Sequence, residues 1–356
     1  MKKFQNNKIV LGLSGGVDST TAALLLKNKG FEVVGFYFDV LGKNQQGVQE
    51  AKKVAEQLDI EFISKDVSKE FGDIVIGDFC NEYINGRTPN PCIVCNPNVK
   101  FKQLIEVADS VSADFIATGH YAQIHHDENM DKYYVKMGEN VSKDQSYMLY
   151  RLGQNVLSRL VFPLGDVADK EETRELARKN NLSNADKKDS QEICFIDEKK
   201  DDYVSYIKNQ GYQIKTGNFI DPKGKILGQH SGLINYTIGQ RKGLGITFGK
   251  PVFVTKINSK DNTVTLGENE DLMINDVYSK DNFFTINSSG EFPEEYQGKE
   301  IFAKIRYAAK PAAARLYKDK DGFVKTTFVH KQRASTPGQS IVFYQDDLVI
   351  GGGFIE

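Results

Sequence analysis

A string of small and polar residues near the start of the sequence has the composition of a phosphate-binding loop. Ser14-Gly15-Gly16-Val17-Asp18-Ser19 follows a short apolar run and precedes a segment rich in Ala and Leu. Glycines let backbone N–H groups approach an anion, and a helix that begins there adds positive potential. The hydroxyls of Ser14 and Ser19 can donate to the same anion, and Asp18 beside a phosphate requires a bridging cation such as Mg²⁺. The string lacks the Gly-Lys-Ser/Thr ending of a P-loop and the glycine spacing of a dinucleotide fingerprint.

The cysteines are the second feature that could carry chemistry. Cys80, Cys92, Cys95 and Cys194 are too few for a disulfide scaffold in a chain of 356 residues. We interpret Cys80 as a small buried hydrophobe. Cys92 and Cys95 form a C-x-x-C pair, which together with Cys194 could ligate an iron–sulfur cluster or form part of a zinc site. Residues 125–128 (His-His-Asp-Glu) have the composition of a metal site, but we expect a solvated turn, because consecutive polar residues rarely converge on one ion.

Composition and charge set the class of protein. The chain is 40% hydrophobic and 11% aromatic, which is enough for ordinary cores. Its 46 Lys and Arg residues against 48 Asp and Glu give a net charge of −2, so binding to nucleic acid must depend on local clusters. The first residues lack the apolar region of a signal peptide, and no run approaches the length of a membrane span. We therefore expect a cytoplasmic protein with no membrane partner, in a reducing compartment.

The elements that must position these residues alternate between strand and helix in the first half. We predict strands at 8–13, 32–40, 61–64 and 114–118, and helices at 18–29, 48–58 and 100–110. Such alternation predicts right-handed βαβ units and a parallel sheet. Ligands of these sheets bind beyond the carboxyl ends of the strands, where residues 12–19 and 118–120 would lie.

The second half changes to short strands. Helices are predicted at 170–180 and 199–210, and a hairpin joins 251–257 to 263–266. Regularly spaced strands follow, which predict a small antiparallel barrel. We place domain boundaries near residues 205 and 270, giving a catalytic domain at 1–205, a small, mostly-β central domain at 206–270 and a C-terminal β-barrel at 271–356.

Several blocks resemble known families. Residues 14–19 resemble the pyrophosphate loop of the ATP pyrophosphatase superfamily, which implies an adenine nucleotide alpha hydrolase-like α/β domain that adenylates a carbonyl oxygen. Five further blocks, in the family's order, resemble the tRNA-specific 2-thiouridylases: Asn85–Asn96, Ala117–Ala122, Lys143–Tyr147, Asp189–Phe195 and Tyr236–Gly245. The resemblance spans residues 9 to 356. It implies a tRNA-uridine 2-sulfurtransferase that uses ATP and Mg²⁺.

The resemblance also assigns site residues. ATP contacts are implied for Gly12, Leu13, Ser14, Gly15, Gly16, Val17, Asp18, Ser19, Phe38 and Gly119. Asp18 could hold the Mg²⁺ that accompanies ATP. The tRNA contacts are implied for Asn90, Pro91, Cys92, His120, Lys143, Asp144, Gln145, Arg306, Tyr307 and Gln339, and the central domain is expected to contact tRNA as well. The implied partners are tRNAs for Lys, Glu and Gln with a wobble uridine, and a persulfide donor protein or cysteine desulfurase.

The resemblance gives the cysteines distinct roles. Cys194 carries a persulfide, and Cys95 releases the sulfur and forms a disulfide with Cys194, which requires their Cα atoms within roughly 7 Å. Lys187, Lys188 or Arg87 could supply positive charge that favours the thiolate. At position 92 many relatives have Asp, so Cys92 could do acid/base work or be idle.

Three alternatives stay open from the sequence. One is thiolation that depends on an iron–sulfur cluster held by Cys92, Cys95 and Cys194. Another is a different adenylating ligase or amidotransferase with the same pyrophosphate loop. The third is a non-catalytic RNA-binding protein, against which the presence of Asp18, Cys95 and Cys194 argues.

Overall fold

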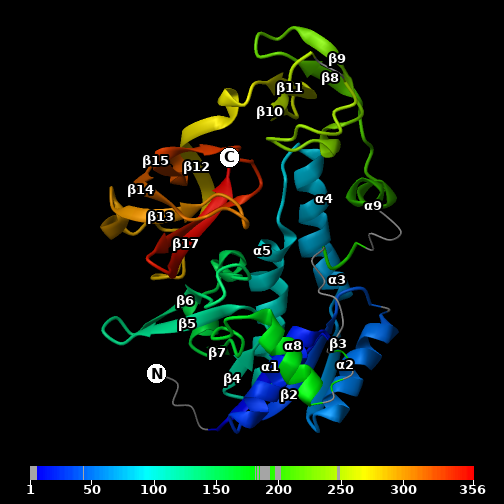
Figure 1. The fold of residues 1–356 in the computed structure, drawn as a ribbon, viewed down its shortest axis with the longest axis vertical. Coiled ribbons are helices and arrows are strands. Elements are labelled where there is room, and N and C mark those ends of the chain that lie inside the picture. The colour runs from blue at the N-terminus through cyan, green and yellow to red at the C-terminus, as the bar shows by residue number, and fades with distance from the viewer. Residues whose placement is uncertain are drawn as a thin grey trace. The chain divides into compact units, whose positions relative to one another are not determined.

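The parallel sheet predicted for the first half is present in the computed structural model, which describes residues 6–42, 44–180, 182, 184, 193–196, 202–246 and 249–356. The chain divides into two units (Figure 1). Unit 1 comprises Met1–Ile74, Cys92–Phe195 and Asp347–Ile350, and unit 2 comprises Val75–Pro91, Ile196–Asp346 and Gly351–Glu356. No described helix combines the length and the apolar character that crossing a membrane requires.

The sheet of unit 1 has the strand order β3-β2-β1-β4-β7, with all neighbours parallel. Its strands are β1 (Lys8–Gly12), β2 (Glu32–Asp39), β3 (Glu61–Asp66), β4 (Phe115–Ala117) and β7 (Leu160–Val161). Ile9 of β1 pairs with Val33 on one side and with Phe115 on the other. The order reverses at β1, so the loops after β1 and β4 leave the same edge of the sheet on either side of a switch point.

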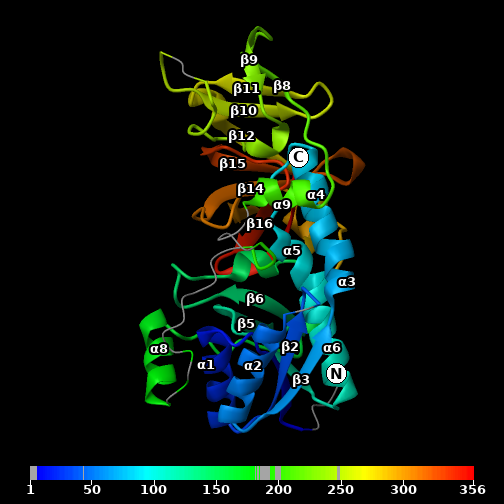
Figure 2. The same ribbon diagram turned by 90° about the vertical axis from the view of Figure 1, so that its right-hand side faces the viewer.

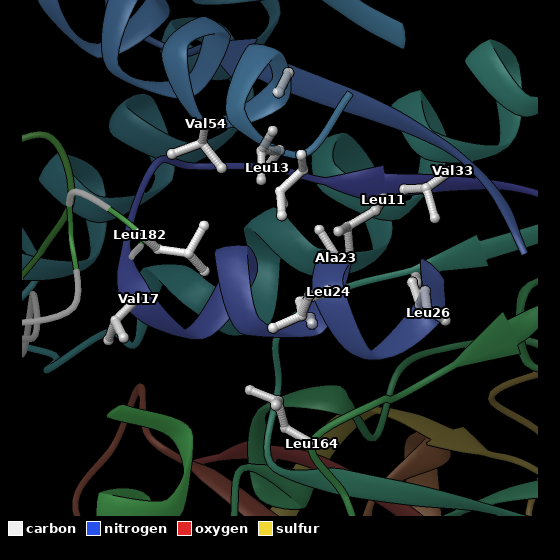
Figure 3. Close-up of a cluster of buried hydrophobic side chains, with 14 of the residues drawn as sticks. Leu11, Leu13, Val17, Ala23, Leu24, Leu26, Val33, Val54, Leu164 and Leu182 are labelled. Atoms are coloured by element: carbon white, nitrogen blue, oxygen red, sulfur yellow. The ribbon is translucent and has the colours of Figure 1, made fainter. Parts of the chain in front are cut away.

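Helices cover both faces of this sheet (Figure 2). They are α1 (Val17–Asn28), α2 (Gln45–Gln57), α6 (Phe101–Ser110) and α8 (Lys170–Lys179). Alternate strand residues point to opposite faces. Leu11 and Leu13 therefore join a buried cluster with Ala23 of α1 and Val54 of α2 (Figure 3). The helix α6 contacts β1 and β4.

A hairpin in unit 1 was not predicted. It consists of β5 (Ala122–Asp127) and β6 (Lys132–Met137). The prediction of a solvated turn at 125–128 is wrong, because His125 and His126 lie on β5 and the turn begins only after Asp127. The ring of His126 stacks on Tyr133 with centroids 4.2 Å apart, and this cross-strand contact extends the strand.

The connection from β3 to α6 is helical, which the sequence analysis left unassigned. It contains α3 (Ser68–Phe71), a π-helical turn (Gly72–Ile76), α4 (Gly77–Ile84), α5 (Pro91–Cys95) and a second π-helical turn (Asn96–Lys100). Both α3 and α5 are too short to show the periodic hydrophobic pattern by which a helix is recognised in a sequence. A short helix, α7 (Gln154–Leu157), precedes β7.

Unit 2 contains two β structures. The smaller follows α9 (Tyr203–Asn209) and has the strand order β10-β11-β8-β9. Its strands are β8 (Gly217–Ile220), β9 (Ile226–His230), β10 (Phe253–Asn258) and β11 (Thr263–Gly267). The predicted hairpin is confirmed, since β10 and β11 are antiparallel partners.

The second β structure is the predicted antiparallel barrel, which is confirmed. Its strands are β12 (Met273–Phe284), β13 (Glu300–Lys304), β14 (Ala312–Lys318), β15 (Val324–Arg333), β16 (Ser340–Gln345) and β17 (Leu348–Ile355). They follow the order β12-β15-β14-β13-β16-β17, and β12 pairs again with β17. This additional pairing closes the barrel and leaves no free edge among its six strands.

Candidate active site

The loop after β1 folds back on itself through its own serines. The backbone N–H of Ser14 donates to Ser19 Oγ at 3.2 Å, and Ser19 Oγ lies 3.1 Å from the Gly16 carbonyl oxygen. Gly15 has a φ of +71°, a left-handed conformation that favours glycine. No side chain caps the start of α1 at Gly16, so the first N–H groups of the helix are available to an anion.

The loop after β4 lies directly against the start of α1. A Cβ atom at Gly119 would be 3.0 Å from the backbone carbon of Asp18 and 3.0 Å from the nitrogen of Ser19. At Gly12, a Cβ atom would be 3.2 Å from the ring of Phe38. The structure thus brings together the loop, Phe38 and Gly119, all predicted as ATP-binding, at one edge of the sheet. This edge offers N–H groups for phosphate and an aromatic ring beside a glycine backbone.

Asp18 is held by two residues that the sequence analysis missed. The hydroxyl of Tyr121 donates to Asp18 Oδ1 at 2.8 Å, and Lys170 Nζ lies 3.2 Å from Asp18 Oδ2. The Tyr121 hydroxyl also lies 3.2 Å from Thr173 Oγ1 of α8. Lys170 is 152 positions away from Asp18, so no spacing in the sequence could have indicated the pair.

Asn184 is a further missed residue at the loop. Its side-chain amide donates to the Gly15 carbonyl oxygen at 2.9 Å and to Thr20 Oγ1 at 2.6 Å. Its residue surface is 8% exposed, and its Oδ1 atom is buried without a protein partner among the described residues. The contact fixes the carbonyl of Gly15 and therefore the orientation of the peptide that leads to Gly16.

Three cysteines meet in unit 1. Cys92 and Cys95 lie on α5, and Cys194 belongs to the short described segment 193–196. All three are free thiols that lie close together: Cys92 and Cys95 raise the pKa of Cys194, and Cys92 raises the pKa of Cys95. The burial expected for Cys80 is confirmed, because it is 0% exposed, and burial raises the pKa of its thiol to about 11.

The surroundings keep two of these thiols protonated. Burial raises the pKa of Cys95, although the charge and a backbone N–H of Lys100 oppose it. Cys194 reaches solvent, yet the protein packed around it, together with Cys92 and Cys95, raises the pKa of its thiol to about 12. At neutral pH both groups are therefore almost entirely thiols.

Lys100, which the sequence did not indicate for this role, places positive charge near Cys95 and Cys194. Arg87 is instead paired in unit 2, with Nε 2.7 Å from Glu82 Oε2 and Nη2 2.8 Å from Glu356 Oε1. Lys187 and Lys188 lie outside the described residues, as do Asp189–Glu192 of the block around Cys194.

His120, predicted as a tRNA contact, is half-buried in unit 1. Its ring lies between Phe101 and Phe162, with centroid distances of 6.2 and 6.0 Å, and its Nδ1 is 2.7 Å from Thr118 Oγ1. Burial and the charge of Lys100 hold its pKa well below the usual value, so the imidazole is neutral at pH 7.

The predicted tRNA contacts of the 143–145 block support the loop that carries Tyr121. Asp144 is buried and accepts hydrogen bonds from Gly138 and Ser146. Gln145 Oε1 accepts the backbone N–H of Tyr121 at 2.9 Å. The side chain of Lys143 is half-buried.

The remaining predicted tRNA contacts lie in unit 2, except Cys92. Arg306 and Tyr307 are exposed, in the segment after β13. The side-chain amide of Gln339 donates to the Thr88 carbonyl oxygen at 2.7 Å, and the N–H of Thr88 donates to Pro337. These bonds hold the segment that leads to Asn90 and Pro91.

The fold and the site together define a nucleotide-binding α/β unit followed by two β modules. Comparison with family models agrees: the model described as "tRNA methyl transferase HUP domain" matches residues 7–198. The "tRNA methyl transferase PRC-barrel domain" matches 205–268, and the "Aminomethyltransferase beta-barrel domain" matches 285–355.

Curated relatives match over nearly the whole chain. A tRNA-specific 2-thiouridylase MnmA of Clostridioides difficile (strain 630) is 43% identical over an alignment of 366 positions that covers 99% of each chain. Another, from Clostridium acetobutylicum, is 44% identical and covers 99% of this chain and 100% of the relative. A third, from Caldanaerobacter subterraneus, is 45% identical and covers 99% and 98%. The chain belongs to the family of tRNA-specific 2-thiouridylases.

Proposed function

We propose that this protein is a cytoplasmic sulfurtransferase that converts the wobble uridine of tRNA into 2-thiouridine at the expense of ATP. The observation that carries the proposal is the presence, in one unit, of a phosphate loop and of two thiols, Cys95 and Cys194, close enough to interact. The names of the relatives support the same reaction. An adenylating ligase with the same loop would have no use for two interacting thiols.

The first step is activation of the base. The uracil O2 atom bonds to the α-phosphorus of ATP, the bond from that phosphorus to the bridging oxygen breaks, and the electron pair leaves with pyrophosphate. The N3 proton of the uracil is released. The N–H groups at the start of α1 would hold the phosphates, with Phe38 and Gly119 beside the nucleoside. This converts a poor leaving group into AMP.

Mg²⁺ fits this site as a companion of the nucleotide. The described residues include no group of three or more His, Cys, Asp or Glu side chains arranged to hold a metal ion. Mg²⁺ in phosphate sites commonly uses one or two carboxylates with phosphate oxygens and water. Asp18 is the residue that would hold it, and the ion would neutralise charge on the departing pyrophosphate.

The second step is sulfur transfer. A donor protein loads Cys194 as a persulfide, whose outer sulfur attacks C2 of the base and displaces AMP. Cys95 then attacks the inner sulfur of Cys194. The sulfur–sulfur bond breaks with its electron pair on the sulfur bound to C2, which yields 2-thiouridine and a Cys95–Cys194 disulfide. An external thiol must reduce that disulfide before the next turnover.

RNA binding completes the proposal. The candidate contacts are Asn90, Pro91, Cys92, His120, Lys143–Gln145, Arg306, Tyr307 and Gln339. Because the net charge is −2, affinity must come from such clusters and must fall steeply with salt. The target base must leave the anticodon stack to expose C2. The ranges 1–205, 206–270 and 271–356 stay our prediction for the domains that share this work.

The decisive experiment is thiolation of an anticodon stem-loop with ATP and a persulfide donor, followed by mass spectrometry. An oxygen-to-sulfur exchange in the wild type supports the proposal. Cys194→Ser should abolish it, and Cys95→Ser should block release of the sulfur. Cys80→Ala, which removes a buried thiol elsewhere, is the matched control and should stay active. A product heavier by a methyl group, or no tRNA-dependent release of pyrophosphate, would contradict the proposal.

Cys92 separates the persulfide mechanism from a cluster mechanism. If only Cys95 and Cys194 change oxidation state, Cys92→Ala should keep activity, with a loss of at most about 10²–10⁴-fold from a displaced acid or base. If all three thiolates hold iron, Cys92→Ala should lose both the metal and the activity. Stoichiometric iron in active protein would favour the cluster.

A further inference from the structure

Lys170 is a cation at the phosphate loop that has no role in the reaction as proposed above. It is the first residue of α8, and α8 packs against α1. The hydroxyl of Thr21 on α1 donates to the backbone oxygen of Thr173 on α8 at 3.2 Å. This bond places the first turn of α8 beside the N-terminal half of α1.

The ammonium of Lys170 lies next to the anion-binding end of α1. Its Nζ is 3.2 Å from Oδ2 of Asp18, which is the second residue of α1. The Lys170 side chain is only 13% exposed, and its Nζ lies 5.8 Å from the centre of the Tyr121 ring. The carboxylate of Asp18 thus joins a largely buried ammonium to the first turn of α1.

The local field makes this an unusual place for a cation. The N-terminus of α1 carries partial positive charge, which disfavours a nearby lysine. The neighbouring Glu171 pairs with Arg178 at 2.7 Å, whereas Lys170 extends to Asp18 of α1. An anion bound at the loop would be stabilised by the lysine and the helix together.

The composition of the loop indicates what that anion is. A P-loop carries its own lysine, which reaches the β- and γ-phosphates, and Ser14–Ser19 has none. Lys170 brings an equivalent charge from another element. We propose that Lys170 binds the β- and γ-phosphates of ATP and stabilises pyrophosphate as it leaves, with Asp18 holding the ammonium in place until the nucleotide binds. The inference rests on the proposed adenylation and adds a residue to that site.

Direct binding separates this role from a purely structural one. Lys170→Met removes the charge and keeps most of the side-chain volume. It should weaken binding of ATP and of pyrophosphate, measured by calorimetry with Mg²⁺, by about 10- to 100-fold. AMP lacks the β- and γ-phosphates, so its affinity should stay within about twofold of the wild type.

Two further variants complete the test. Lys170→Arg keeps the charge and should recover much of the ATP affinity. Lys179→Met removes an exposed lysine at the other end of α8 and should match the wild type. Equal losses of ATP and AMP affinity in Lys170→Met would overturn the inference, as would unchanged ATP affinity. A wild-type protein that binds ATP but does not modify tRNA would contradict the proposed function and leave the role of Lys170 standing.

Discussion

The contact between Gly119 and the start of α1 can be tested with one methyl group. Gly119 does not have a positive φ, so alanine suits its backbone conformation. The only obstacle is space. The new Cβ atom would lie 3.0 Å from Asp18 C, 3.0 Å from Ser19 N and 3.2 Å from Asp18 O. These are backbone atoms, which cannot rotate away as a side chain can.

The cost of Gly119→Ala follows from those distances. Comfortable contacts begin near 3.5 Å, so the loop and the helix must separate by about 0.5 Å. Overpacking of this kind destabilises a protein by about 1–3 kcal/mol. The strain falls on the N–H groups proposed to hold phosphate. We therefore expect a loss of ATP affinity in addition to the loss of stability.

The assay combines urea unfolding with ATP binding. Gly72→Ala is the matched control, because a Cβ atom at that helical position in the same unit meets nothing within 4 Å. Alanine there should be neutral or stabilising by up to about 1 kcal/mol. If Gly119→Ala had wild-type stability and ATP affinity, the close approach of the two loops would be refuted.

Three other predictions concern single contacts. Cys194 should react with iodoacetamide at pH 8 roughly 100-fold more slowly than a free cysteine, because its pKa is raised to about 12 and little of it is thiolate. The greater nucleophilicity of that thiolate offsets only part of the smaller thiolate fraction. A rate equal to that of free cysteine would contradict this. Arg87→Ala should lower the free energy of unfolding of unit 2 by about 1–3 kcal/mol, because Glu82 loses its partner while Glu356 keeps Lys280. Breaking an exposed pair such as Lys69–Asp73 should cost under about 1 kcal/mol. Asn184→Ala should weaken ATP binding by releasing the carbonyl of Gly15, and Asn184→Asp should do the same because a carboxylate cannot donate; calorimetry that finds either variant unchanged would count against the contact.

The part of the fold that could be predicted is the part specified by local patterns. Apolar runs such as Ile9–Leu11, followed by glycine and then a helix, identify each element from consecutive residues. The alternation of strands and helices then implies a parallel sheet. The hairpin of β5 and β6 escaped prediction because His125 and His126 look polar in sequence. Their strand is stabilised by a cross-strand aromatic contact with Tyr133, which sequence periodicity does not reveal.

Within the site, too, features specified by consecutive residues could be predicted and contacts between distant residues could not. The phosphate loop is six consecutive residues, so its composition alone indicates its chemistry. Tyr121 and Lys170 reach Asp18 from positions 103 and 152 residues away, and only the folded chain brings them there. Of the residues expected to supply charge near the cysteines, Lys187 and Lys188 lie outside the described residues, so only Arg87 can be compared. Arg87 stands close to Cys92 in sequence, but its guanidinium pairs with Glu82 and Glu356.

The raised pKa values of Cys95 and Cys194 are consistent with the proposed two-step chemistry. A thiolate is the form that attacks and the form that oxidises, so a permanently ionised pair would close into a disulfide before sulfur arrived. Burial keeps both groups neutral, and Lys100 acts in the opposite direction on each of them. Its charge also lowers the pKa of His120, so one lysine biases three groups. Burial and the neighbouring cysteines therefore hold the pKa of each thiol up against this lysine. Displacing the segment around Cys194 from its protein surroundings would lower the pKa of its thiol.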